Sequence, residues 1–206
     1  MPVQNRVDPI GELNADPDRG LIMGNRGGGF HREDQTLKDR HWASRHWIVC
    51  VLSFNDSKRK LIQPGLYTEL FFLDEATALA GGHRPWFKCR REEAGRFRDC
   101  LVGAGRLKAG DKADTIDTQA AGEIQTILGG VRDREIVDPA SLPNGAICAA
   151  GGLTWLKHAD AAPQWFISGS GAEERRHPPG KRLTPRITCI ALHAGYAPVL
   201  HSLVNG

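Results

Sequence analysis

The stretch Tyr67–Arg91 constrains the fold more than any other part of the chain. Its first seven residues, YTELFFL, are mostly aromatic and apolar, which predicts a largely buried strand. Asp74 is a competent helix N-cap, and the alanines and leucine after it predict a short helix that ends at the Gly81–Gly82 pair. A rigid Arg-Pro turn then leads to Cys89. A strand, a short helix and a glycine-rich turn that carries a cysteine are typical of a binding-site scaffold.

The length and composition are those of an ordinary globular protein. The 206 residues are enough for one large domain or two small ones, and 40% are hydrophobic and 25% charged. The net charge is only +3, so a nucleic-acid surface would require local clustering of the basic residues. No apolar run approaches the roughly 18 residues that a membrane span needs, and the first residues lack an apolar signal core. We therefore expect no membrane contact.

Cysteine usage indicates the compartment. The chain has five cysteines, an odd number, at widely scattered positions: Cys50, Cys89, Cys100, Cys148 and Cys189. Such a set is typical of a protein in a reducing cytoplasm and does not suggest a disulfide framework. The sequence therefore predicts a cytoplasmic protein with free thiols.

Periodicity and turn signals predict an α+β fold. A short antiparallel meander over residues 45–73, with a glycine-rich turn and helices after it, should be followed by a small β-rich module and a terminal helix. We expect four segments: an irregular N-terminal arm over 1–20, an α+β domain over 21–107, a helical connector over 108–141, and the β-rich module with its C-terminal helix over 142–206. Thr184 is the expected N-cap of the terminal helix, with Pro185 in its first turn.

Three features of the central stretch resemble the metal-binding domain of the Ada DNA-methylation repair protein. They are the Phe71-Phe72 pair, the Ala-Leu-Ala-x-Gly run and the Arg-Pro-x-x-x-Cys ending. The resemblance covers at most residues 46–92. The chain as a whole also resembles an uncharacterised bacterial family of about this length. Residues 21–107 are therefore expected to form an Ada-like domain of the metal-binding type.

The resemblance implies a zinc site that is incomplete here. In the Ada pattern four cysteines hold zinc; Cys89 matches the last of them and Cys50 could match the first, whereas Trp86 stands where another ligand should be. Two cysteines cannot complete a tetrahedral site, so an imidazole, that of His83, His46 or His41, would have to join them. The alternatives are a zinc site formed by Cys50, Cys89 and His83, and a scaffold that has lost its metal.

The resemblance also implies a role for Cys50. In Ada the first cysteine accepts a methyl group from a DNA phosphotriester, and Cys50 is the candidate for a catalytic residue of this kind. Its activation would require zinc or a cationic neighbour that favours the thiolate. Because Trp86 occupies a ligand position, we expect methyl transfer to be absent or weak.

Basic and aromatic residues that could contact nucleic acid occur in three segments. The glycine-rich GNRGGG lets backbone amides approach an anion, KDRHWASRHW interleaves cations with indoles that stack on bases, and the stretch after residue 83 is rich in arginine. The predicted contact residues are Arg26, Arg40, Trp42, Arg45, Arg84, Arg90 and Arg91. The leading hypothesis is a protein that binds DNA or RNA and is connected with DNA repair; solvated loops and helix faces are the alternative explanation of the same charges.

Two further functions stay open on the sequence. His31, His41 and His46 lie near two carboxylates, Glu33 and Asp34, and such a group could hold a divalent ion in a metal-dependent hydrolase or nuclease. The spacing of these residues fits an exposed polar loop equally well. The third possibility is an interaction module without catalysis.

Overall fold

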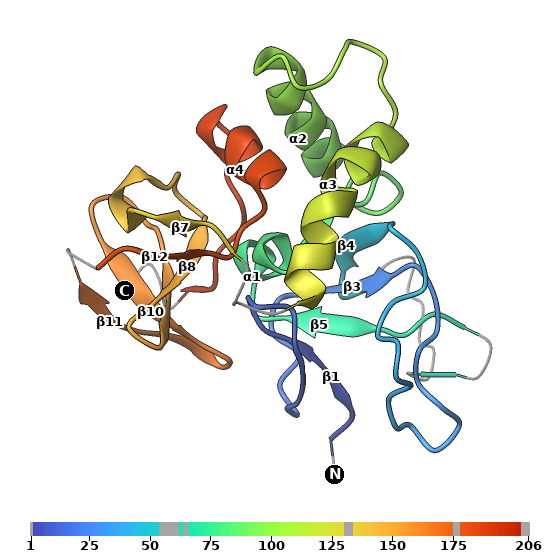
Figure 1. Ribbon diagram of the computed structural model, residues 1–206. Helices are drawn as coiled ribbons and strands as arrows, with labels where there is room; N and C mark the ends of the chain where they lie inside the picture. The colour runs from blue at the N-terminus through green and yellow to red at the C-terminus, as the bar shows by residue number, and fades with distance from the viewer. Residues whose placement is uncertain (1, 54–61, 64–65, 130–133, 175–177, 203–206) are drawn as a thin grey trace.

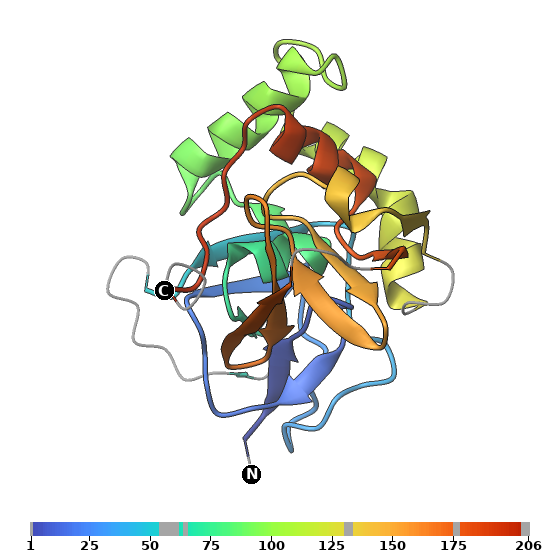
Figure 2. The same ribbon diagram turned by 90° about the vertical axis from the view of Figure 1, so that its left-hand side faces the viewer.

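The structure is a computed structural model that describes residues 2–53, 62–63, 66–129, 134–174 and 178–202. The fold is α+β, with two six-stranded sheets and a short helix that lies between them (Figures 1 and 2). Three longer helices pack together on one side of the molecule. Within the described residues, none of the helices has the length and apolar character that crossing a membrane requires.

The first sheet is built from the N-terminal part of the chain and has the strand order β2-β1-β5-β3-β4-β6. The strands are β1 (Gln4–Val7), β2 (Leu13–Ala15), β3 (Ile22–Arg26), β4 (Trp47–Val51), β5 (Leu70–Phe72) and β6 (Arg84–Pro85). β3 is antiparallel to both β4 and β5, whereas β1–β5 and β4–β6 are parallel pairs.

Two expectations for this region are wrong. Residues 1–20 are not an irregular arm, because they contribute β1 and β2, and Val7 is fully buried. β4 and β5 are not neighbours in a simple meander, because β3 lies between them. The position of β3 between β4 and β5 could not be predicted from local signals, because β3 pairs with segments that lie far along the chain. Gly24 and Asn25 also weaken the strand signal of β3 itself. The middle of the predicted meander, residues 54–65, lies mostly outside the described residues.

The short helix α1 (Glu75–Ala80) is the centre of the molecule, and its predicted caps are confirmed. The Asp74 carboxylate accepts hydrogen bonds from the Thr77 amide at 2.9 Å and from the Thr77 hydroxyl at 2.7 Å. Gly82 follows the helix with a φ of +85°, which favours glycine. All six helical residues are buried. Ala78 joins the core of the first sheet, whereas Ala76 and Ala80 pack against the second.

The second sheet has the order β11-β10-β9-β8-β12-β7. Its strands are β7 (Ile136–Val137), β8 (Ile147–Ala150), β9 (Leu153–Leu156), β10 (Ala162–Phe166), β11 (Gly169–Glu174) and β12 (Gly180–Arg182). β8 and β9 form a hairpin of the predicted β-rich module, and its two-residue turn is Gly151–Gly152 with φ values of +62° and +80°. A single 3-10 turn, Pro139–Ser141, precedes β8.

The longer helices are α2 (Arg91–Gly103), α3 (Ala113–Leu128) and α4 (Arg186–His193). All three were expected near these positions. Thr184 is not the N-cap of α4, however; its hydroxyl accepts a hydrogen bond from the Ile147 amide at 2.8 Å, and Pro185 occupies the cap position. Thr184 therefore joins the terminal helix to the second sheet.

Candidate functional site

The fold brings Cys50 and Cys89 together. β6 runs parallel to β4, with Ile48 opposite Arg84, so the chain that follows β6 returns to β4. The Trp86 amide then donates to the Val49 carbonyl at 3.0 Å, and Cys50 and Cys89 form a disulfide with a Cα–Cα distance of 5.7 Å. The expectation of free thiols is therefore wrong for these two residues. A Cys50 sulfur held in a disulfide is not a nucleophile.

His83 does not join the cysteines. Its ring is 1% exposed and packs against Trp47 and Phe72, with centroid distances of 5.2 and 4.7 Å. Burial, and then the nearby charge of Arg26, hold the pKa of His83 well below its usual value. Among the described residues, Cys50, Cys89 and His83 are not in a group of three ligand atoms close enough to share an ion.

Three of the arginines predicted to contact nucleic acid point into the protein. Arg26 is 1% exposed, lies over the Trp47 ring at 4.2 Å and donates to the Gly11 carbonyl at 2.9 Å. Its burial lowers its pKa to about 9. Arg84 and Arg90 are also buried, and each forms a two-pronged ion pair with a carboxylate. All three guanidinium groups therefore donate to acceptors within the protein.

The two buried ion pairs join segments that lie apart in the chain. Arg84 donates to the two carboxylate oxygens of Asp117 on α3 at 2.6 and 2.7 Å. Arg90 donates to those of Glu75 on α1 at 2.8 and 2.9 Å. Burial alone would lower the pKa of Arg90, but its bonds to Glu75 raise it. Such pairs hold their partners in one geometry, because losing either partner leaves a buried charge without compensation.

Glu75 has further partners at the centre of the molecule. Its carboxylate also accepts from the Tyr196 hydroxyl at 2.5 Å and from the Val199 amide at 3.0 Å. Burial, and then the charge of Glu75, raise the pKa of Tyr196. One carboxylate at the start of α1 thus holds both the N-terminal end of α2 and the segment that follows α4.

The other predicted contact residues reach solvent. Arg40 is exposed and lies over the Trp42 ring at 3.6 Å. Arg91 is exposed at the first position of α2. Arg45 is exposed too, but it pairs with Asp114 at 2.6 Å. The predicted set therefore divides into a buried group and an exposed group.

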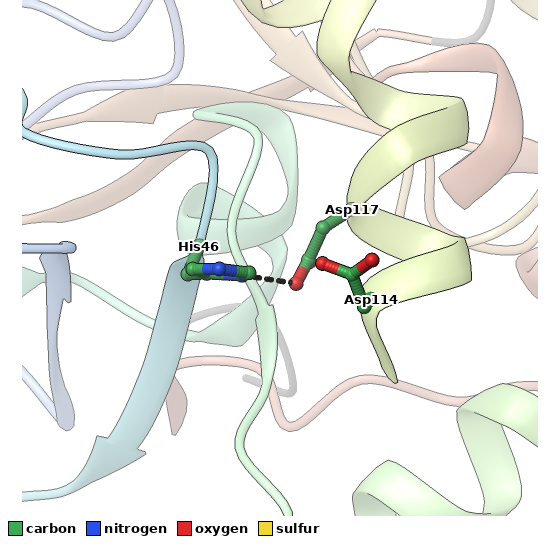
Figure 3. A group of neighbouring side chains, drawn as sticks. All are labelled: His46, Asp114 and Asp117. Atoms are coloured by element: carbon green, nitrogen blue, oxygen red, sulfur yellow. Dashed lines mark hydrogen bonds and ion pairs between the residues drawn. The ribbon is translucent and has the colours of Figure 1, made fainter. Parts of the chain in front are cut away.

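A group of three side chains could hold a metal ion. His46, Asp114 and Asp117 place one ligand atom each within 4.8 Å of the others, and the His46 ring lies 2.7 Å from an Asp117 oxygen (Figure 3). These carboxylates also have cationic partners, since Arg84 binds both oxygens of Asp117 and Arg45 binds Asp114. With two carboxylates against two guanidinium groups, the group carries no net charge when His46 is neutral.

The predicted histidine cluster is not gathered around one ion. His31 is buried, and its ring nitrogens lie 3.2 Å from the Thr68 hydroxyl and 3.2 Å from the Gln4 carbonyl. Burial lowers the pKa of His31. Of the three histidines His31, His41 and His46, only His46 belongs to the described group of potential metal ligands.

An open pocket of about 460 Å³ lies beside His31 and was missed by sequence reasoning. Its lining includes two exposed cations, Arg32 and Lys38, one exposed carboxylate, Glu33, and Tyr67, which is 37% exposed. The Lys38 ammonium is 3.4 Å from the Gly29 carbonyl. A Cβ at Gly29 would lie 2.3 Å from the Leu66 carbonyl oxygen, so glycine is required where the two segments meet. The only sequence signal for the pocket was this run of glycines.

Comparison with known proteins adds no identification. The chain matches no family model, no curated protein and no solved structure. The resemblance to Ada therefore depends on the residues quoted above.

Proposed function

We propose that the protein binds single-stranded nucleic acid, DNA or RNA, through the connection between β3 and β4 and the pocket beside it. The observation that carries the proposal is the lining of the pocket, where two cations, Arg32 and Lys38, outnumber one carboxylate, Glu33, beside the exposed residue Tyr67. Proteins that bind single strands without sequence preference combine these two elements, a cationic groove for the phosphates and an aromatic platform for the bases.

The cations of this connection differ in how freely they can reach a phosphate. Arg32 is 3.3 Å from Asp39, whereas Lys38 makes a long contact with the Gly29 carbonyl. Arg40 packs on Trp42 without a carboxylate partner among the described residues. Lys38 and Arg40 are therefore the residues assigned to the phosphate backbone.

Tyr67 is assigned to a base. Its ring opens onto a pocket whose volume lies within the range of about 300–1,000 Å³ typical of small-ligand sites. A flat base could stack on this ring, and stacking of this kind contributes roughly 1–3 kcal/mol per base. The Gly29 backbone, which has no side chain, leaves room for the strand to approach.

The test is a titration of labelled single-stranded oligonucleotides by fluorescence anisotropy at several salt concentrations. For the wild-type protein, affinity should fall steeply with salt, because counterions are released from the phosphates. Lys38→Ala and Arg40→Ala should each weaken binding. In each variant the slope of log K against log salt concentration should become shallower by about 0.7 for every phosphate that is no longer neutralised. Tyr67→Ala should weaken binding with little change in salt dependence.

Matched variants distinguish binding at this surface from non-specific attraction between nucleic acid and any exposed cation of the protein. Tyr67→Phe keeps the ring and should bind like the wild type. Lys108→Ala removes an exposed cation between α2 and α3 and should leave affinity unchanged. No binding at low salt, or equal losses of affinity in Lys38→Ala and Lys108→Ala, would contradict the proposal.

Metal-dependent hydrolysis, with zinc as the ion, is a second candidate supported by one observation. The His46, Asp114 and Asp117 ligand atoms lie within 4.8 Å of one another, and imidazole and carboxylate are acceptable zinc ligands. An ion there would take oxygens that Arg84 and Arg45 now bind, so it must replace two ion pairs. This competition ranks zinc below nucleic-acid binding.

Metal content distinguishes the two candidates. Protein purified without a chelator should contain zinc near one per chain if the second candidate holds, and Asp114→Asn should lower that content. Zinc near zero in the wild type, together with unchanged binding of oligonucleotides, would leave the first candidate alone.

A further inference from the structure

The five cysteines fall into two chemical groups. Cys148 and Cys189 are buried, and burial raises the pKa of each to about 11. Burial and the neighbouring Asp99 also raise the pKa of Cys100, whose sulfur lies 3.4 Å from the Ala194 carbonyl. These three thiols are protonated near neutral pH. Cys50 and Cys89 are bonded to each other, and both residues are only half-buried.

The two bonded sulfurs have unequal surroundings. Cys89 immediately precedes Arg90, the N-cap of the 13-residue helix α2, and this helix has no side-chain hydrogen bond at its N-cap. The first amides of a helix have no acceptor within it, and they carry its positive end. Cys50 lies on the strand β4 and has no helix terminus beside it in the sequence.

The charges around Cys89 partly oppose each other. Lys88 and Arg91 are exposed cations on either side, whereas Glu92 and Glu93 are carboxylates in the first turn of α2. Arg90 is bound to Glu75 and is only 3.8 Å from Glu93. The helix amides are therefore the element that distinguishes Cys89 from Cys50, because formal charges of both signs surround it in similar number.

We propose that Cys50 and Cys89 are a reversible dithiol–disulfide pair that exchanges with small thiols, with Cys89 as the leaving sulfur. A thiolate attacks the Cys50 sulfur and forms a mixed disulfide, while the Cys50–Cys89 bond breaks and Cys89 leaves as a thiolate. A second thiolate then attacks the sulfur of the small thiol, which releases an oxidised dimer and the Cys50 thiolate. Two small thiols thus supply the two electrons and two protons that reduce the pair.

The fold has the connections needed to survive this reaction. The Trp86 amide still bonds to Val49, and β6 still pairs with β4, when the sulfurs separate. The ion pair between Arg90 and Glu75 holds the start of α2 independently of the disulfide. Reduction is therefore expected to change the segment 86–89 and leave the two sheets in place.

The test is a redox titration of the folded protein in buffers of reduced and oxidised glutathione. Acid quenching, alkylation with an isotope-coded reagent and peptide mass spectrometry would report each cysteine. Cys50 and Cys89 should become reduced together along one two-electron curve, while Cys148 and Cys189 stay unlabelled until the protein is unfolded. Cys100→Ser is the matched control and should leave the curve unchanged.

Single variants test the order of the sulfurs. Cys89 in Cys50→Ser should be alkylated faster at neutral pH than Cys50 in Cys89→Ser, because the helix end stabilises the thiolate. Circular dichroism would check that both variants fold; if either does not, the mixed glutathione disulfide trapped in the wild type should lie on Cys50.

Three results would overturn the proposal. The pair could stay bonded in reduced glutathione until denaturant is added, which would make it a structural disulfide. Both cysteines could be labelled as free thiols in oxidised glutathione, which would show that no bond forms. Equal or reversed reactivity of the two sulfurs would refute the role of Cys89.

Discussion

Two arginines beside α2, Arg84 and Arg90, and Arg40 of the β3–β4 connection look alike in the sequence but differ in the structure. Arg84 and Arg90 are buried, and each binds both oxygens of one carboxylate. Arg40 is exposed and packs on Trp42. A cluster of arginines in a sequence therefore has two explanations, and the position of the carboxylates decides between them.

The difference teaches where a cationic surface can be sought in this protein. Desolvating a guanidinium is costly, so a buried one is retained only with a matched partner. Asp117 and Glu75 are those partners, 33 and 15 residues away from their arginines in the chain. Lys38 and Arg40 are exposed and have no carboxylate partner of this kind among the described residues, which is why the proposed nucleic-acid surface includes them.

The largest expected effect comes from the neighbours Arg90 and Arg91. Arg90→Ala should lower the free energy of unfolding by about 3–5 kcal/mol, because Glu75 would be left buried without its partner. Arg91→Ala, at an exposed position, should change it by about 0.5 kcal/mol or less. Urea denaturation followed by circular dichroism measures both.

A double variant sharpens this first comparison. Arg90→Met combined with Glu75→Gln removes both charges and should be more stable than Arg90→Ala alone. If Arg90→Ala and Arg91→Ala had the same effect, the division into buried and exposed arginines would be wrong.

Reduction of the disulfide should have the second-largest effect. Cys50 and Cys89 close a loop with a sequence separation of 39, so opening the bond should lower the free energy of unfolding by about 2–4 kcal/mol. Urea midpoints with and without reductant report the change. Cys100→Ser should not reduce the difference between the two conditions, whereas Cys89→Ser should abolish it.

His83 should make stability depend on pH. Its pKa is lowered in the folded protein, so between the folded value and the ordinary value of 6.5 the unfolded chain binds a proton that the folded protein does not. Stability contributed by the neutral ring is present above about pH 6.5 and is lost as the pH falls, by up to about 1.4 kcal/mol per pH unit.

Denaturation of the wild type and of His83→Phe from pH 7.5 down to pH 5.5 isolates this contribution. The phenyl ring keeps the contacts with Trp47 and Phe72 but does not titrate. The stability difference between the two proteins should shift in favour of His83→Phe as the pH falls. A difference that stays constant across this range would show that His83 titrates equally in both states.

The smallest effect is expected for the exposed ion pair of Arg45 and Asp114. Arg45→Ala should leave the urea midpoint within experimental error, since water and salt screen such pairs. Asp117→Asn, which weakens the buried pair with Arg84 on the same helix, should lower it clearly. Equal midpoints for the two variants would mean that burial does not set the strength of these pairs.

Local signals were sufficient for most of the helices and for the turns. Asp74 and the glycines after residue 80 define α1, and the Gly151–Gly152 turn defines the β8–β9 hairpin. They failed for β1 and β2, because a strand of three or four residues needs partners that a window of sequence does not contain. They failed for the pocket beside Tyr67 for the same reason, since its walls come from segments about 30 residues apart.

The sequence by itself determined the α+β class, the central helix with its caps, and the presence of clustered arginines and scattered cysteines. Only the tertiary structure decided which arginines are buried, which two cysteines form a bond, and that His83 lies apart from them. The physical reason is that capping and hairpin turns involve neighbours in the chain, whereas ion pairing, disulfide formation and desolvation depend on partners that folding brings together from distant segments.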